Sequence, residues 1–192
     1  MSPGDGAGGR GAALEVVSAG AMLALAGTIL PGEGNLSVRL DQSSCVITPA
    51  GADKGRLAAR DLIRLPLVGG DVPDGTSTEA ALHLVVYRRF SAVRAIVHAH
   101  PFQVLALAER RRLPECTLLL EGVEVIGSVA WVDATPPRSR ALAEAVSRGL
   151  ETAPACVLHR HGAVTVGATM AEAVVRLLLL ERLAALTAST PG

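Results

Sequence analysis

Hydrophobic and polar positions follow two different periods along the chain, and the two periods predict interleaved strands and helices. Short apolar runs between turn residues are typical of strands, and they occupy 34–40, 44–51, 60–68, 92–100, 128–134 and 155–167, the last with a bend at Gly162. Apolar residues at helical spacing predict helices at 77–90, 101–111, 139–150 and 169–186. This order favours the α/β class, with helices on both faces of one mixed sheet.

The amino-terminal part contains an apolar segment, 12–30, that could be mistaken for a targeting signal or a membrane anchor. Glu15 interrupts the run, Arg10 is the only basic residue before it, and the polar turn "PGEGN" follows directly. We therefore expect a packed first helix here and one domain over residues 12–192. Residues 1–11 are rich in glycine, and we expect them to be disordered.

Capping signals mark the ends of three predicted helices. Ser77 or Thr78 is placed to cap the start of the helix at 77–90. Gly149 is placed to end the helix at 139–150, and Thr169 with Glu172 forms a capping-box pattern at the start of the last helix.

Composition and charge narrow the class of protein. The chain has 192 residues, of which 49% are hydrophobic and 19% charged, as in a soluble globular domain. Its net charge is +0, which gives no reason to expect nucleic acid or an anionic membrane as a partner. Cys45, Cys116 and Cys156 are widely spaced and form no CxxC motif. We therefore expect a cytoplasmic protein without disulfides.

Four of the five histidines form two pairs with the spacing HxH. His98 and His100 end a predicted strand, where residues i and i+2 point to the same face. Two imidazoles on one face can bind a divalent cation, although polar residues where a strand meets solvent would have the same pattern. His159 and His161 form the second pair and could supply a distant third ligand.

The predicted helix at 77–90 carries two more candidates. Glu79 in its first turn could be a metal ligand, a general base or a partner of the helix dipole, and position alone favours the last. His83 lies four residues later on the same helix face, so a Glu-x-x-x-His ligand pair is conceivable, although a packed structural histidine is the simpler interpretation.

Three glycine-containing turns could bind an anion, namely those at 32–35, 48–51 and 75–78, and the last opens a helix. Turns of this composition usually have no binding role. Lys54 is the only lysine, and a Schiff-base nucleophile is one interpretation of it. It lies in the polar loop "GADKGRL", where a surface position or an ion pair is the better expectation.

The order and spacing of four segments resemble the class II aldolase/adducin head family: "GNLSVR", "ITPAG", "STEAALHLVVYRRFSAVRAIVHAHP" and "LHRHGAVTVG". The resemblance covers about residues 13–188 and is nearest to the L-fuculose-1-phosphate aldolase branch. It implies a three-layer α/β/α sandwich with a mixed, largely antiparallel sheet. It also implies a homotetramer with active sites between subunits.

The resemblance also implies roles for individual residues. His98, His100 and His161 match the ligands of Zn²⁺, for which Mn²⁺ or Co²⁺ could substitute, whereas His159 matches no ligand. Glu79 matches the catalytic carboxylate. The positions that hold the substrate phosphate are matched by Asn35, Gly51, Ser77 and Thr78.

The implied activity is that of a metal-dependent lyase, an aldolase that cleaves or forms a carbon–carbon bond in a small sugar phosphate through a metal-bound enediolate. "DKGRL" also resembles the methylthioribulose-1-phosphate dehydratase branch, and epimerase or decarboxylase chemistry would suit the same site. An adducin-like binding module is a further alternative, but such heads lose the metal ligands. Two departures from the aldolases concern the substrate: Ala50 stands where a hydroxyl residue is common, and residues 115–121 lack the tyrosine that the family supplies from a neighbouring subunit.

Overall fold

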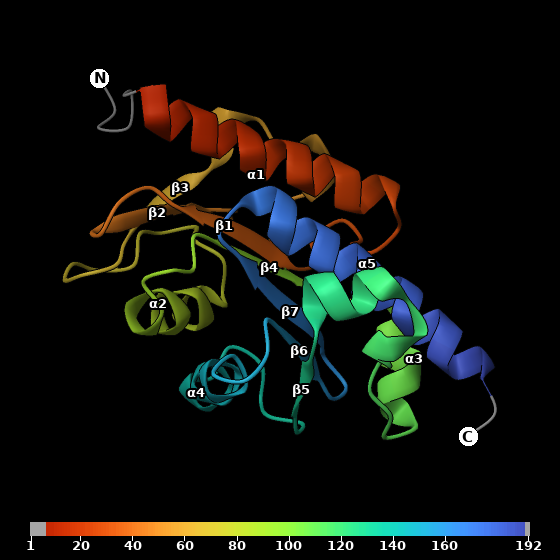
Figure 1. Cartoon of the computed structure of the whole chain (residues 1–192). Coiled ribbons are helices and arrows are strands. Elements are labelled where there is room, and N and C mark those ends of the chain that lie inside the picture. Colours follow the sequence, from red (N-terminus) through yellow and green to blue (C-terminus); the bar gives the residue numbers. More distant parts are fainter. Residues whose placement is uncertain (1–6, 191–192) are drawn as a thin grey trace.

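The structure is a computed structural model that describes residues 7–190, and it shows a seven-stranded sheet between two layers of helices (Figure 1). The strand order is β3-β2-β1-β4-β7-β6-β5. Neighbouring strands are antiparallel except β5 and β6, which are parallel. The predicted α/β sandwich with a mixed, largely antiparallel sheet is therefore confirmed.

The elements follow the predicted order along the chain. The strands are β1 (Asn35–Arg39), β2 (Ser44–Ile47), β3 (Ile63–Pro66), β4 (Ala95–Ala99), β5 (Val129–Val132), β6 (Ala155–Leu158) and β7 (Gly162–Gly167). The helices are α1 (Ala7–Leu25), α2 (Ala80–Arg89), α3 (Phe102–Glu109), α4 (Arg140–Gly149) and α5 (Met170–Ser189). Four short helical turns complete the set: η1 (Lys54–Arg56), η2 (Ala59–Asp61), η3 (Cys116–Leu118) and η4 (Gly122–Ile126).

The sheet separates two hydrophobic cores. Helices α1, α3 and α5 cover one face, and α2 and α4 cover the other (Figure 1). In β4, Val97 and its i±2 neighbours belong to the core under α1 and α5, whereas Ile96 belongs to the core under α2 and α4. The alternation of side chains along a strand places His98 on the face of Ile96. A polar residue therefore enters the layer between the sheet and α2.

Two predicted helix starts need correction. Helix α1 begins at Ala7, so residues 7–11, which we expected to be disordered, are helical, while residues 1–6 lie outside the described part. Val16 and Leu23 of α1 are fully buried, as expected for a packed helix. Helix α2 begins at Ala80 with Glu79 as its N-cap, not Ser77 or Thr78. The Ser77 hydroxyl instead accepts a hydrogen bond from the Glu79 amide, within the turn before the helix.

The other two capping predictions agree with the structure. The Thr169 hydroxyl accepts a hydrogen bond from the amide of Glu172, whose carboxylate accepts one from the amide of Ala168. Gly149 is the last residue of α4. A Cβ at Gly149 would lie 2.8 Å from Cys156 Sγ, so glycine also allows α4 to approach β6 closely.

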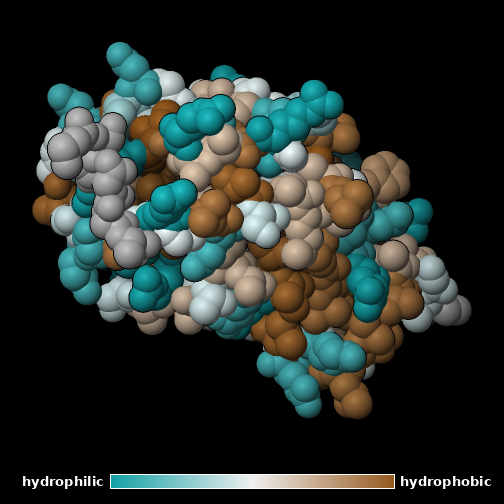
Figure 2. Space-filling view, turned by 90° about the horizontal axis from the view of Figure 1, so that it is seen from above, coloured by the Kyte–Doolittle hydropathy of each residue, from teal (hydrophilic) through white to brown (hydrophobic). Residues whose placement is uncertain are grey.

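The surface over α1 and α5 contains an apolar groove of about 980 Å³. Figure 2 shows the molecule from above, with apolar and polar side chains mixed on this face. Leu14, Met22 and Val175 line it and are about half exposed. Within residues 7–190, no helix is both long enough and apolar enough to cross a membrane. The three cysteines are buried and unpaired, and burial raises the pKa of Cys45 and of Cys156 to about 12.

Candidate metal centre

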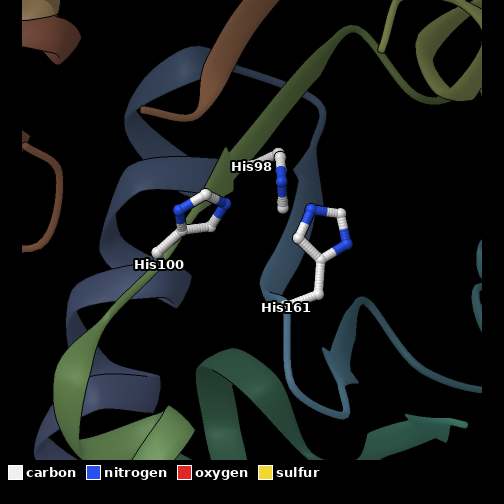
Figure 3. Close-up of side chains that lie close together, drawn as sticks. All are labelled: His98, His100 and His161. Atoms are coloured by element: carbon white, nitrogen blue, oxygen red, sulfur yellow. The ribbon is translucent and has the colours of Figure 1, made fainter. Parts of the chain in front are cut away.

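Three histidines from two parts of the chain meet at one end of the sheet. His98 is in β4, His100 follows that strand, and His161 lies in the tight turn between β6 and β7. Their rings converge (Figure 3), with centroids 5.1 Å apart for His98 and His100, 4.8 Å for His98 and His161, and 5.4 Å for His100 and His161. One ligand nitrogen from each lies within 4.8 Å of the others, which is a spacing that a single ion can bridge.

The backbone of the turn makes this convergence sterically feasible. Arg160 has a left-handed conformation with φ of 60°, which turns the chain sharply between His159 and His161. Gly162 follows, and a Cβ there would lie 2.3 Å from the carbonyl oxygen of Ala99 and 2.7 Å from His100 Cδ2. Only glycine therefore lets the turn approach the end of β4 this closely.

Hydrogen bonds leave the histidines with free nitrogens that face one another. His98 Nδ1 lies 2.9 Å from the carbonyl oxygen of Ala163 and can only donate to it, so Nε2 of the neutral ring carries the lone pair. Of the five buried side-chain polar atoms without a hydrogen-bond partner in residues 7–190, four lie here: His98 Nε2, His100 Nε2, His161 Nδ1 and Glu79 Oε1. Buried polar atoms normally have partners. This group of unpaired nitrogen and oxygen atoms suits a divalent cation held by neutral imidazoles.

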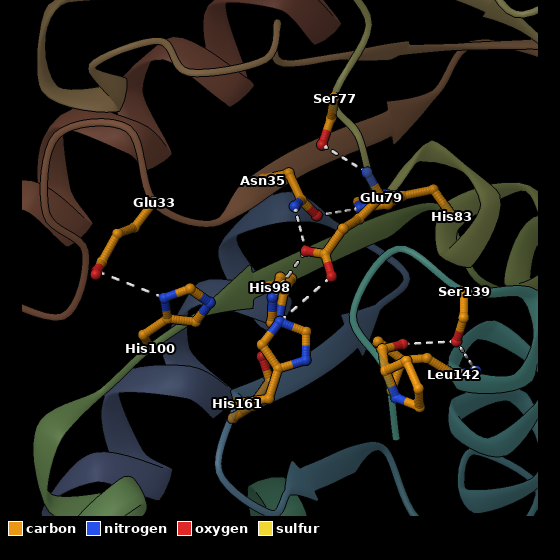
Figure 4. Close-up of polar contacts among 12 residues, drawn as sticks. Glu33, Asn35, Ser77, Glu79, His83, His98, His100, Ser139, Leu142 and His161 are labelled. Atoms are coloured by element: carbon orange, nitrogen blue, oxygen red, sulfur yellow. Dashed lines mark hydrogen bonds and ion pairs between the residues drawn. The ribbon is translucent and has the colours of Figure 1, made fainter. Parts of the chain in front are cut away.

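Glu79 lies beside the histidines and is 8% exposed. Its Oε2 is 3.1 Å from His98 Nε2, and its Oε1 is 3.3 Å from His161 Nε2 (Figure 4). Burial alone would raise the pKa of this carboxyl group, but the imidazoles of His161 and His98, which lie close to its two oxygens, outweigh that effect and hold its pKa well below the usual range. A carboxylate in this position can act on a ligand that enters between it and the histidines.

A chain of hydrogen bonds runs from Glu79 into the layer between the sheet and α2. The Asn35 amide nitrogen donates to Glu79 Oε2 at 3.0 Å, and Asn35 Oδ1 lies 2.5 Å from His83 Nε2. His83 Nδ1 lies 2.6 Å from the Ser37 hydroxyl, which lies 2.8 Å from the hydroxyl of Tyr87. Because both nitrogens of His83 have partners, this residue supports the site and lies outside the histidine cluster.

His159, the other histidine of the second pair, also lies outside the cluster. Its ring packs against Trp131 with centroids 5.2 Å apart, and its Nε2 is 3.8 Å from Glu109 Oε1. The HxH spacing at 159–161 therefore does not give two converging imidazoles, because the turn points the two side chains in different directions.

A small cavity of about 190 Å³ opens beside Glu79, His100 and His161. Four residues that the family resemblance assigned to phosphate binding line it, namely Asn35, Gly51, Ser77 and Thr78. A bridge between Pro49 and Thr76 and a hydrogen bond from the Ala50 amide to the Gly75 carbonyl oxygen hold the two turns together. The predicted anion-binding turns at 48–51 and 75–78 thus form one wall of one cavity.

Three charged residues of the cavity were not identified as site residues from the sequence. Lys54 is 2% exposed, so the expected surface position is wrong, and no carboxylate of residues 7–190 forms an ion pair with it. Glu33 Oε2 lies 3.6 Å from His100 Nδ1 and can orient that ring. Arg138 lines the cavity from the segment before α4 with a φ of 63°. The only sequence feature that pointed to one of these three residues was the turn "GEGN", which contains Glu33.

The fold and the site together define an α/β domain with a candidate three-histidine metal centre and an adjacent carboxylate. The profile of the family described as Class II Aldolase and Adducin N-terminal domain matches residues 14–188, and the chain belongs to this family. The expected resemblance is thereby confirmed.

The chain is similar to aldolases and, over a shorter stretch, to dehydratases. An L-fuculose phosphate aldolase from Methanococcus maripaludis is 35% identical over 153 residues, which cover 80% of this chain and 83% of the relative. The crystal structure of L-fuculose-1-phosphate aldolase from Thermus thermophilus is 32% identical with a TM-score of 0.83, and the match covers 95% of this chain and all of that one. A methylthioribulose-1-phosphate dehydratase from Pectobacterium carotovorum is 38% identical over 99 residues, which are 50% of this chain and only 47% of that protein.

Proposed function

We propose that this protein is a zinc-dependent class II aldolase that cleaves or forms a carbon–carbon bond in a small sugar phosphate. The observation that carries the proposal is the convergence of His98, His100 and His161 beside Glu79, with unpaired buried nitrogens on all three rings. Membership of the family and the similarity to L-fuculose phosphate aldolases over most of the chain support the reaction class.

The three histidines would hold the metal and leave its charge undiminished, because neutral imidazoles carry no charge. Zn²⁺ suits three nitrogen ligands with an open position, and Mn²⁺ or Co²⁺ could replace it. When bound, the metal supplies Lewis-acid stabilisation of the negative charge that develops on substrate oxygens during cleavage. The Ala163 carbonyl and the Glu33 carboxylate would fix the orientation of the His98 and His100 rings.

Glu79 would transfer the proton between the substrate hydroxyl group and carbon. Its Oε2 is held by the Asn35 amide, whereas its Oε1 has no hydrogen-bond partner and is the oxygen that can accept a proton from a substrate hydroxyl group. Breaking the adjacent carbon–carbon bond leaves an electron pair on the retained fragment, and the same carboxyl group can return the proton to carbon. This role for Glu79 requires no Schiff base.

The wall formed by the turns at 48–51 and 75–78 would bind the phosphate group. Backbone N–H groups near Gly51 and the hydroxyls of Ser77 and Thr78 line the cavity at the start of α2, and helix starts favour anions. Asn35 uses one amide N–H for Glu79 and retains a second for the substrate.

Metal analysis of matched variants tests the proposal. We expect the purified protein to carry about one zinc ion per chain, since the three histidines of one chain form one set of ligands. His98→Ala should lose both the metal and the release of dihydroxyacetone phosphate from L-fuculose 1-phosphate. His159→Ala removes a neighbouring histidine outside the cluster and should keep the metal. Equal zinc contents in the two variants would show that the metal centre lies elsewhere.

A methylthioribulose-1-phosphate dehydratase is the second candidate, because a dehydratase has the higher local identity over 99 residues. Both reactions would use the same metal and carboxylate, so product analysis must separate them. A new carbon–carbon bond between dihydroxyacetone phosphate and an aldehyde indicates the aldolase. Loss of water from a pentulose phosphate indicates the dehydratase.

We also propose a cytoplasmic homotetramer with sites between subunits. Exposed apolar side chains support an intersubunit contact, since Phe102 is 69% exposed, Leu120 81% and Val123 52%. Light scattering at micromolar concentration should give four times the chain mass of 19.7 kDa. A monomer with full activity would contradict the shared site.

A further inference from the structure

The only lysine of the chain is buried in the wall of the candidate active-site cavity. Lys54 begins η1, three residues after Gly51, and lines the cavity together with Ser77, Thr78 and Glu79. Helix α1 packs over η1. A Cβ at Gly20 of α1 would lie 2.5 Å from the carbonyl oxygen of Lys54 and 3.2 Å from its Cβ. The close approach of the helix excludes solvent from that side of Lys54.

The ammonium group of Lys54 has less than its full set of partners. Nζ donates one hydrogen bond, to the carbonyl oxygen of Ala52 at 2.9 Å, although a lysine has three donors. The neighbouring carboxylate of Asp53 is engaged elsewhere, with the amide of Gly55 and with Arg56. Burial lowers the pKa of Lys54, and the charge of Asp53 offsets this only in part. A buried cation without an ion pair is costly to maintain, so an anion beside it would stabilise the folded protein.

We propose that Lys54 binds the anionic end of the substrate, a phosphate monoester, in this cavity. The inference rests on the proposed function, because it names the substrate group that the same site takes. A compact ammonium group suits a phosphate oxygen. Ala50 offers no hydroxyl on this wall, and the charge of Lys54 supplies the attraction there. The small volume of the cavity, about 190 Å³, suits a short phosphorylated fragment.

The single lysine allows a test on the unmodified holoenzyme. Protein labelled with ¹³Cε-lysine gives one lysine side-chain signal, and inorganic phosphate is titrated into the zinc-loaded protein. We expect the signal to shift and to saturate at the phosphate concentration at which the heat of binding saturates in a calorimetric titration. A signal that stays constant while phosphate binds would overturn the proposal. So would the absence of phosphate binding in a protein that holds stoichiometric zinc, which would leave the metal-dependent function intact.

Three variants provide the second measurement. Lys54→Met removes the charge with little change in volume, and we expect it to weaken phosphate binding about 30-fold or more, because it removes a buried ionic partner. Lys54→Arg should retain most of the binding. Arg56→Met is the matched control, since its side chain is 88% exposed on the same short turn and does not line the cavity, and it should bind phosphate as the wild type does.

Kinetics separate a binding role from a structural one. Lys54→Met should raise KM for a phosphorylated substrate and leave kcat/KM for the unphosphorylated sugar unchanged. An equal loss for both substrates would instead indicate a general structural effect and contradict the assignment. Borohydride reduction in the presence of substrate should give no covalent adduct, and an adduct on Lys54 would show a Schiff base in place of ion pairing.

Discussion

The amide group of Asn35 connects Glu79 to His83. Its nitrogen donates to Glu79 Oε2 at 3.0 Å, and its oxygen lies 2.5 Å from His83 Nε2. Because the amide nitrogen faces a carboxylate, the amide oxygen must be the acceptor for His83, so His83 Nε2 is protonated and Nδ1 accepts from the Ser37 hydroxyl. A neutral His83 thus fixes the orientation of Asn35, and Asn35 fixes one oxygen of Glu79.

Replacement of Asn35 by alanine should disturb Glu79 more than the fold. Asn35→Ala leaves Glu79 Oε2 and His83 Nε2 without this buried partner, and each unpaired group costs about 1–3 kcal/mol. We therefore expect a loss of about 2–4 kcal/mol in the free energy of unfolding. We also expect kcat to fall by about tenfold or more, as for loss of a group that orients an active-site residue. Urea unfolding and steady-state kinetics measure these effects. A variant with unchanged kcat would show that Glu79 needs no support from Asn35.

His83 should make the protein sensitive to acid. Burial lowers the pKa of His83 to about 3, from an ordinary value of 6.5, and the charge of Glu79 offsets this only in part. The unfolded chain therefore binds a proton between these two pH values while the folded protein does not. The resulting stability is fully present above about pH 6.5 and is lost as the pH falls towards 3, by about 1.4 kcal/mol per pH unit.

Comparison with His83→Gln isolates this effect. Glutamine can still donate to Asn35 but does not titrate, and the nearby Glu79 and His98 remain in both proteins. We expect the stability advantage of the wild type to shrink by about 2 kcal/mol between pH 6.5 and pH 5, measured by urea unfolding. Parallel pH profiles for the two proteins would mean that His83 is protonated in the folded state.

The sequence predicted the sheet and most helices because their apolar residues follow regular periods, as in the alternation of Ile96 and Val97 across β4. It predicted the helix start of α2 less well. Ser77 and Thr78 have suitable side chains for a cap, but the chain forms an additional turn there, and this depends on contacts with the distant turn at 48–51. Residues 7–11 are helical although three of them are glycines, so the composition of this segment did not reveal where α1 begins.

The spacing of residues in the sequence predicted only part of the candidate site. The pair His98 and His100 is visible in the strand pattern, but His159 and His161 have the same spacing, and only the left-handed turn at Arg160 shows which one faces β4. Lys54 was misplaced because the loop around it is polar, whereas its burial comes from α1, which is more than 25 residues earlier in the chain. Long-range packing decides both cases.

Gly162→Ala should weaken the metal centre without removing a ligand. The added methyl group would lie 2.3 Å from the carbonyl oxygen of Ala99, so the turn that carries His161 must move away from His100. We expect metal affinity to fall about 10- to 100-fold, as for loss of a group that orients a ligand. Competition with a zinc-binding dye measures this affinity. Gly11→Ala is the control, because a Cβ there has nothing within 4 Å, and it should bind zinc normally.

Removal of the metal should lower the melting temperature of the protein. Without the ion, the converging nitrogens of His98, His100 and His161 are buried polar atoms with no hydrogen-bond partner. The hydrogen bonds to water that they lose on folding are then not replaced. Zinc at 100 times its dissociation constant would stabilise the folded state by about 2.7 kcal/mol, which corresponds to about 5–10 °C for a chain of this length. Calorimetry of the chelator-treated and zinc-reloaded protein measures the difference. His98→Ala should show no such response, and an equal zinc-dependent shift in that variant would place the stabilising ion outside the three-histidine cluster.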